Sequence, residues 1–134
     1  MHDHNDNRSS YRVRSLAKVQ GAYDTLGGLW PLVSMPLFEA LTGPKPEEWL
    51  VRAVAGVLLF LGSLLLHDAF RRKRIDRGLR IMAAGISAVL GLVAVVSSLG
   101  GWVSWVYFID GTIHLSFTLA WVVISLIPGT LQRS

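Results

Sequence analysis

Ionisable residues inside long apolar runs are the features of this sequence that could carry chemistry. Asp110 and His114 lie four residues apart, so on a helix they share one face, one turn apart. A charged side chain at the centre of a bilayer costs about 2.5–3.5 kcal/mol by insertion scales, and such residues usually pair, line water or function. We therefore predict a polar pocket that opens toward the outer face of a membrane. Its predicted ligand-binding residues are Glu39, Arg52, Asp110 and His114.

Two other arrangements of Arg52 remain open. Its guanidinium could form a purely structural ion pair with Asp110, or it could snorkel outward to Glu48 or the lipid headgroups. Asp24 is expected about 10 Å along its helix from Ala17, on the cytoplasmic side and apart from the outer pocket. Asp24 is a candidate proton or ion relay, with a structural role as the alternative.

The sequence contains little evidence for a catalytic site or a metal site. Zinc sites use three or four protein ligands, whereas the Asp110-x-x-x-His114 spacing supplies two, with Glu39 as a doubtful third. The chain has no cysteine, which excludes disulfides and thiolate ligands. We predict no metal site, identify no catalytic motif and name no cofactor. The sequence favours a protein that is not an enzyme.

Long apolar runs must position these residues. The chain has 134 residues, enough for one domain, of which 51% are hydrophobic, and its mean hydropathy is +0.45. A membrane span needs roughly 20 predominantly apolar residues. The fold class is therefore predicted to be all-α, a polytopic membrane protein with an antiparallel bundle of four transmembrane helices. The spans are expected at about 17–36, 48–66, 81–99 and 102–127, within a domain at 15–134 that follows a polar cytoplasmic tail at 1–14.

The first apolar run is irregular. It contains Asp24, the pair Gly27-Gly28 and the pair Trp30-Pro31, which predict a kink or break near its middle. A short interfacial turn is expected at 37–41, followed by a rigid turn at 42–46. Basic residues precede this run without a convincing cleavage site, so we expect it to stay in the membrane rather than act as a cleaved signal peptide.

The basic residues predict an orientation. Four Lys or Arg residues lie in the first 18 residues, six between the second and third runs, and one near the C-terminus, against two on the other side. This bias of eleven against two places both termini in the cytoplasm. An isoelectric point near 10.0 is explained by this topology, so we expect the lipid bilayer, and no nucleic acid, as the partner. Trp49, Trp102 and Trp105 should lie at the outer interface.

Each predicted span carries a minority face of small and polar residues at helical spacing, which should face the other helices. On the first two spans these faces are Gln20, Asp24, Gly28 and Pro31, then Arg52, Gly56, Ser63 and His67. On the third and fourth they are Arg80, Ala84, Ser87, Gly91, Ala94 and Ser98, then Asp110, His114, Thr118, Trp121 and Ser125. Close packing explains the third face without any functional role.

Three segments carry a resemblance: Trp30-Pro31-Leu32, the stretch at 38–45, and Trp49-Leu50-Val51-Arg52. About a quarter of the chain thereby resembles uncharacterised small four-helix membrane proteins of bacteria. In size, topology and embedded charges the chain also looks like the DoxX-like four-helix proteins. The resemblance implies a bacterial inner-membrane location. Members of the DoxX-like class have been linked to quinone-dependent oxidation and to small-ligand binding, so the resemblance implies these possibilities and assigns no activity.

Three functions follow as hypotheses. The first is a membrane protein that binds a small amphiphile or ion in a polar pocket of the helix bundle. The alternative is an accessory or structural subunit of a larger membrane complex. A homo-oligomer is a separate possibility for its partners, and would count against the subunit hypothesis. A third hypothesis is a proton or ion pathway from Asp110 and His114 to Asp24, because histidine titrates near neutral pH.

Overall fold

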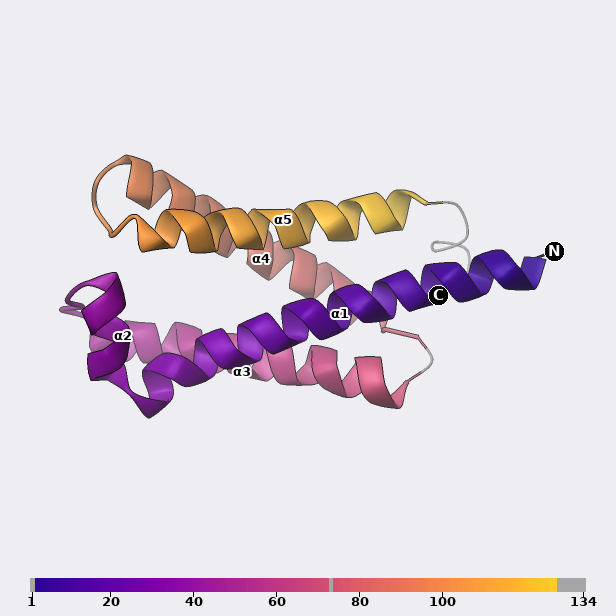
Figure 1. The fold of residues 1–134 in the computed structure, drawn as a ribbon, viewed down its shortest axis with the longest axis horizontal. Coiled ribbons are helices and arrows are strands. Elements are labelled where there is room, and N and C mark those ends of the chain that lie inside the picture. The colour runs from indigo at the N-terminus through magenta and orange to yellow at the C-terminus, as the bar shows by residue number, and fades with distance from the viewer. Residues whose placement is uncertain (1, 73, 128–134) are drawn as a thin grey trace.

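Five helices make up the computed structural model, which describes residues 2–72 and 74–127. They are α1 (His2–Val33), α2 (Met35–Thr42), α3 (Glu48–Arg71), α4 (Arg77–Leu99) and α5 (Val106–Leu126). No strand occurs among the described residues, so the all-α prediction is confirmed. The four long helices run lengthwise in alternating directions, and the short α2 lies at one end of the molecule (Figure 1).

The first helix is longer and more regular than expected. The segment predicted as a polar tail forms the first turns of α1, which then continues through Gly27, Gly28 and Pro31. The break expected near the middle of the first span was therefore wrong. The helix instead ends after Val33, where Ser34 is extended and accepts a hydrogen bond from the Leu37 N–H at the start of α2.

Three helices, α3, α4 and α5, are long and apolar enough to cross a membrane by length and composition. The helix α1 does not meet this description, because Lys18, Gln20 and Asp24 interrupt its apolar half. The short helix expected at 37–41 is present as α2, and Gly43 follows it with a φ of 90°. This positive φ favours glycine and turns the chain toward α3.

The helices pack as two pairs, α1 with α3 and α4 with α5. Glycines allow both close approaches: a methyl group at Gly62 of α3 would lie 2.5 Å from Thr25 Oγ1 of α1. A methyl group at Gly91 of α4 would likewise lie 2.9 Å from the Gly111 carbonyl oxygen of α5. Such small residues let helix backbones approach closely in lipid.

The predicted inward face of α3 was wrong. Arg52, Ser63 and His67 are exposed, and the buried face of the helix carries Gly62 and Leu65 instead. The physical reason is that close backbone approach to α1 requires the smallest residues at the contact. Ser63 needs no partner on another helix, because its hydroxyl donates to the Leu59 carbonyl of its own helix at 2.7 Å.

The inward faces predicted for the other three long helices carry buried residues. These include Gln20 and Asp24 of α1, Ser87 and Gly91 of α4, and His114 and Trp121 of α5. The largest apolar core lies toward one end of the bundle. It consists of Val13, Ala17, Leu61, Leu65, Ala69, Ile75, Leu79, Ala83 and Trp121.

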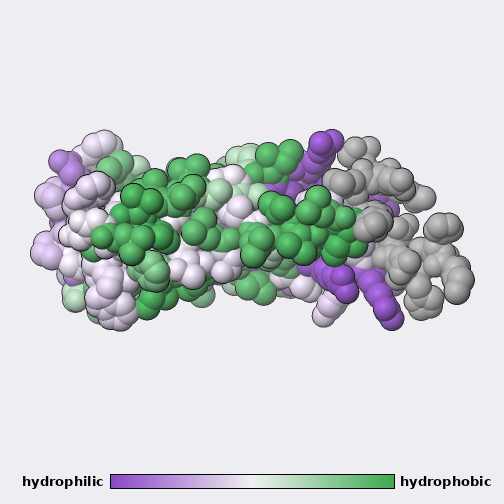
Figure 2. All heavy atoms as spheres, turned by 90° about the horizontal axis from the view of Figure 1, so that it is seen from above, coloured by the Kyte–Doolittle hydropathy of each residue, from purple (hydrophilic) through white to green (hydrophobic). Residues whose placement is uncertain are grey.

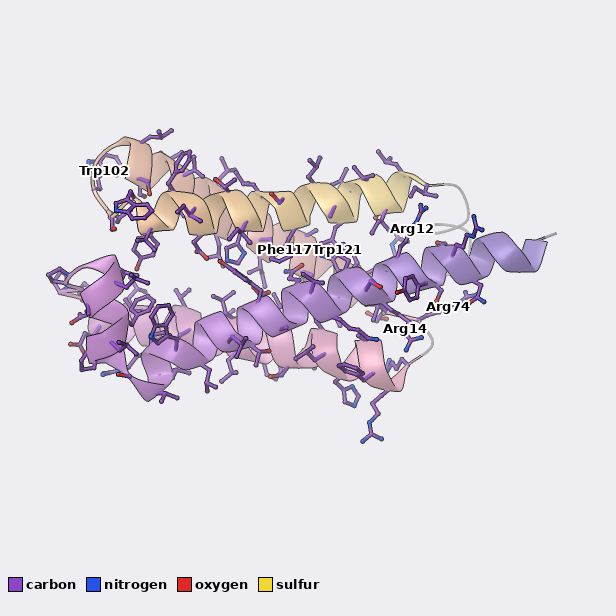
Figure 3. All side chains as sticks on the ribbon, in the orientation of Figure 1. Arg12, Arg14, Arg74, Trp102, Phe117 and Trp121 are labelled. Atoms are coloured by element: carbon purple, nitrogen blue, oxygen red, sulfur yellow. The ribbon has the colours of Figure 1, made fainter. Side chains whose placement is uncertain are left out.

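The outer surface is apolar along the middle of the molecule, and strongly hydrophilic side chains gather toward one end (Figure 2). That end carries Arg12, Arg14 and Arg74, whereas Trp102 lies at the opposite end (Figure 3). Trp49, Trp102 and Trp105 are all exposed, as expected for interfacial residues.

Candidate functional site

A buried glutamine joins three helices at the centre of the molecule. Gln20 Nε2 donates to Ser87 Oγ of α4 at 2.9 Å and to Asp24 Oδ2 of its own helix at 3.1 Å. The Gln20 carbonyl oxygen accepts a hydrogen bond from Trp121 Nε1 of α5 at 2.6 Å. Because Gln20 supplies both a donor and an acceptor, it satisfies the indole of Trp121 and the hydroxyl of Ser87 together.

A second set of polar groups lies beside this one, between α1 and α5. The Tyr23 hydroxyl donates to Asp110 Oδ1, and His114 Nε2 lies 3.8 Å from Asp110 Oδ2. The rings of Tyr23 and His114 meet edge to face with centroids 5.6 Å apart. Phe117 packs on the Tyr23 ring at the same distance. Figure 3 shows Phe117 and Trp121 on the side of α5 that faces α1.

Asp24 adjoins both sets, although the sequence placed it apart from the outer pocket. It is hydrogen-bonded to Gln20 and is next in sequence to Tyr23, whose hydroxyl donates to Asp110. Asp24 is 1% exposed, yet its Oδ1 has no hydrogen-bond partner among the described residues.

We define the acid cluster as Asp24, Asp110, Tyr23 and His114. His114 is 2% exposed, and its Nδ1 also has no hydrogen-bond partner in the described part of the chain. No lysine or arginine among the described residues forms an ion pair with either aspartate. Buried polar atoms are normally hydrogen-bonded, so two unpaired ones in a single cluster need an explanation.

Two of the four residues predicted to share the outer pocket do not join it. The Arg52 guanidinium pairs with Glu48 of its own helix at 3.0 Å, which is the snorkelling arrangement rather than a pair with Asp110. Its helix packs chiefly on α1, whereas Asp110 lies on α5, which packs chiefly on α4. Glu39 accepts a hydrogen bond from the Lys45 backbone N–H at 2.9 Å and so stabilises the turn after α2.

Lys45 covers the end of the bundle near α5. Its ammonium donates to the carbonyl oxygens of Thr42 and Gly43 at 2.9 and 2.7 Å, and it lies 5.1 Å from the centroid of the Tyr107 ring. Partial burial lowers the pKa of Lys45, and the nearby Glu39 carboxylate opposes that shift. The pair of Glu39 and Lys45 therefore organises a turn and leaves the acid cluster unneutralised.

The acid cluster is more accessible from one end than from the other. The side chain of Asp110 is 39% exposed, and it follows the first residue of α5 by about 6 Å along the helix. Beyond Gln20, toward the basic end, the apolar core fills the bundle with residues such as Ala17, Leu65 and Ala83. The arrangement can therefore hold a positively charged group that arrives past Asp110.

Sequence reasoning missed part of this site. Gln20, Ser87 and Trp121 were placed on inward faces by their helical spacing, but nothing in the sequence indicated that they bond to one another. Tyr23 was not on the inward face predicted for the first span, although its hydroxyl donates to Asp110. The only sequence signal for its role was its position next to Asp24. Among the described residues, no group of three or more His, Asp or Glu side chains could hold a metal ion.

A scan against protein-family models matches no family, and searches of curated proteins and of solved structures find no match.

Proposed function

We propose that this chain is an integral membrane protein with four spans that binds a small organic cation at the acid cluster. The observation that carries the proposal is that neither the buried Asp24 nor the partly exposed Asp110 forms an ion pair with a lysine or arginine of the described residues. Intramembrane ionisable residues usually mark a binding or transport site. The hypothesis that the pocket binds a small amphiphile or ion is thereby narrowed to a positively charged ligand.

The helix α1 serves as the fourth span in this proposal. Its polar residues Gln20 and Asp24 are buried against other helices, so they would not meet lipid. Large apolar side chains are exposed along the same part of the helix, from Val19 through Leu26 to Val33. This outer face covers about 21 Å along the helix axis, and α1 packs lengthwise on α3, which is itself apolar enough to span.

The proposed orientation places both termini in the cytoplasm of a bacterial inner membrane. Basic residues gather where the chain begins and between α3 and α4, at the same end of the molecule. The chain has no cysteine, so single cysteines introduced at Ser9 and Pro46 give a clean test with a membrane-impermeant thiol reagent. In intact cells the reagent should modify the cysteine at position 46 and leave position 9 unmodified. The reverse pattern would contradict the orientation.

The surroundings of the acid cluster favour an organic ammonium over a metal ion. The rings of Tyr23, His114 and Phe117 contact one another edge to face, and those of Tyr23 and His114 adjoin the Asp110 carboxylate. Aromatic rings attract quaternary ammonium groups. Zinc sites use three or four protein ligands, and no three His, Asp or Glu side chains of the described residues converge as a metal-binding group.

The same geometry favours binding over conduction. A pathway would need polar groups on both sides of the acid cluster, but the bundle beyond Gln20 is filled by the apolar core. Of the two aspartates only Asp110 is partly exposed, and the apolar core fills the bundle on the far side of Gln20. We propose a binding protein rather than a proton or ion channel.

Binding of benzyltrimethylammonium to the purified protein in detergent micelles tests the proposal. Equilibrium dialysis should show saturable binding to wild type and a loss of at least tenfold in affinity for Asp110→Asn. The matched control is Glu48→Gln, which removes an acid that pairs only with Arg52 at the surface and should leave binding unchanged. Neopentylbenzene, which has the same shape without the charge, should not compete. Equal binding of wild type and Asp110→Asn would contradict the proposal.

A further inference from the structure

The two aspartates of the acid cluster are in different situations. Asp110 is partly exposed, accepts a hydrogen bond from the Tyr23 hydroxyl and has the His114 ring beside it. Asp24 is 1% exposed and accepts one hydrogen bond, from Gln20 to Oδ2, while Oδ1 has no partner. Two carboxylates that share a poorly solvated site do not readily ionise together. Of the two carboxyl groups, that of Asp110 is the better solvated.

Few other charged groups face Asp24. From α5 come Asp110 and His114, and its own helix contributes Tyr23 and, further along, Lys18, whose ammonium lies 4.8 Å from the centroid of the Phe70 ring. The charged residues of the other helices lie toward helix ends, and in α3 Glu48 pairs with Arg52 and Asp68 with His67. These residues are Glu39 of α2, Glu48, Arg52, His67, Asp68 and Arg71 of α3, and Arg77 and Arg80 of α4.

We propose that Asp24 holds a proton in the free protein and releases it when an organic cation binds, so that proton and cation compete for one carboxylate. This inference rests on the proposed function. In the exchange, the O–H bond of the Asp24 carboxyl breaks and its electron pair stays on the oxygen. The proton leaves to the solvent past Asp110, and the ammonium group takes its place. The net charge of the cluster is the same before and after.

This charge balance is what a membrane environment favours. An ionised Asp24 without a cation would leave a second negative charge in a region that water reaches poorly, which is costly. If Asp24 stayed protonated, Asp110 alone would neutralise the bound cation. Asp24 Oδ1 would then still have no partner. Exchange avoids both states, because each form of the site contains one neutralised Asp24 and one ionised Asp110.

Exchange predicts that affinity depends on pH in a defined way. If one proton leaves for each cation that binds, the affinity for benzyltrimethylammonium rises tenfold per pH unit wherever free Asp24 is protonated. Isothermal titration calorimetry in phosphate and in Tris buffer at the same pH measures the protons released directly, since the two buffers have different ionisation enthalpies. We expect about one proton per cation for wild type.

The Asp24→Asn variant separates this inference from the proposed function. It should bind the probe more weakly and release no proton, whereas Glu48→Gln should release as many protons as wild type. Difference infrared spectra of wild type give a second measurement that needs no variant. Addition of benzyltrimethylammonium should remove the carbonyl stretching band of a protonated carboxylic acid, and this band should be missing in Asp24→Asn.

The outcomes distinguish the two claims. Saturable binding that is independent of pH, with no proton released and no infrared change, would overturn the exchange and leave the proposed function standing. Proton release that persists unchanged in Asp24→Asn would also overturn it, because another group would be the source. Absence of saturable binding at every pH would overturn the proposed function and this inference with it.

Discussion

Replacing Gln20 by methionine removes the polar group that joins three helices while nearly preserving side-chain volume. The substitution breaks the hydrogen bonds to Ser87 at 2.9 Å, to Asp24 at 3.1 Å and from Trp121 at 2.6 Å. Side-chain hydrogen bonds inside membrane proteins contribute about 0.6 kcal/mol on average and at most about 1.7 kcal/mol. Three average bonds therefore contribute about 2 kcal/mol.

The polar groups that lose Gln20 as a partner add to this destabilisation. The Trp121 N–H and the Ser87 hydroxyl lose partners at sites that are 2% and 1% exposed, and an unsatisfied buried group costs about 1–3 kcal/mol. Part of that cost is already contained in the bond energies, so we expect Gln20→Met to lower the free energy of unfolding by about 2–4 kcal/mol.

The assay is unfolding in mixed detergent micelles, followed by near-ultraviolet circular dichroism, which reports the packing of tryptophan. Ser63→Ala is the control, because the Ser63 hydroxyl bonds only within its own helix and is exposed. The control should change the free energy of unfolding by less than about 0.5 kcal/mol. A double-mutant cycle with Trp121→Phe should show non-additivity. A Gln20→Met variant as stable as Ser63→Ala would refute the reasoning.

Three further predictions follow from particular contacts. Gly62→Ala should lower the free energy of unfolding by about 1–3 kcal/mol in the same assay, because its methyl group would lie 2.5 Å from Thr25 Oγ1; Gly56→Ala, which faces open space, should not. The pKa of Lys45 is lowered in the folded protein, so at pH values just below its ordinary pKa of 10.5 the unfolded chain binds more protons than the folded protein does. The free energy of unfolding should therefore rise with pH in that range. The Lys45→Gln variant should not show this rise. A pH profile of unfolding free energy identical to that of wild type would contradict the prediction. Arg52→Gln should leave the dialysis-measured affinity for benzyltrimethylammonium unchanged, since Arg52 pairs with Glu48; a tenfold loss would place it in the site.

Much of the fold follows from the apolar runs. The helix α3 was expected to start at residue 48 and does so, and the end of α4 at Leu99 was also predicted. Both helix ends have a local sequence signal. Acidic residues lie at the start of α3, and the pair Gly100-Gly101 follows the end of α4. The length of α1 was not predictable in this way, because its first half is polar and lacks apolar periodicity.

The inward face of α3 shows where periodicity misleads. Arg52, Ser63 and His67 fall at helical spacing, and polarity within an apolar run suggested that they face the other helices. The structure reverses this for α3, because close contact with α1 is made by glycine and alanine. A polar side chain can also be satisfied on its own helix, as Ser63 and Arg52 are, and sequence spacing does not reveal that.

The candidate site was only partly predictable for a related reason. Asp110 and His114 could be paired from their four-residue spacing, which one helix fixes. The approach of Asp24 and Tyr23 to Asp110 depends on how α1 and α5 cross, and that crossing is set by side chains spread over both helices. The rise of 1.5 Å per residue gives the position of a residue along its own helix. It does not give the distance between residues on two different helices.

The central claim is that an organic cation binds between Asp24 and Asp110. Solid-state NMR of the protein in lipid bilayers tests it directly, with nitrogen-15 in the ammonium group of benzyltrimethylammonium and carbon-13 in the aspartate carboxyl groups. The account predicts a dipolar coupling that places the nitrogen within about 6 Å of two carboxyl carbons, the range over which an opposite charge stabilises a carboxylate. It also predicts that Asp24→Asn and Asp110→Asn each remove one of these couplings. Coupling to lipid headgroups alone, unchanged in both variants, would contradict the claim.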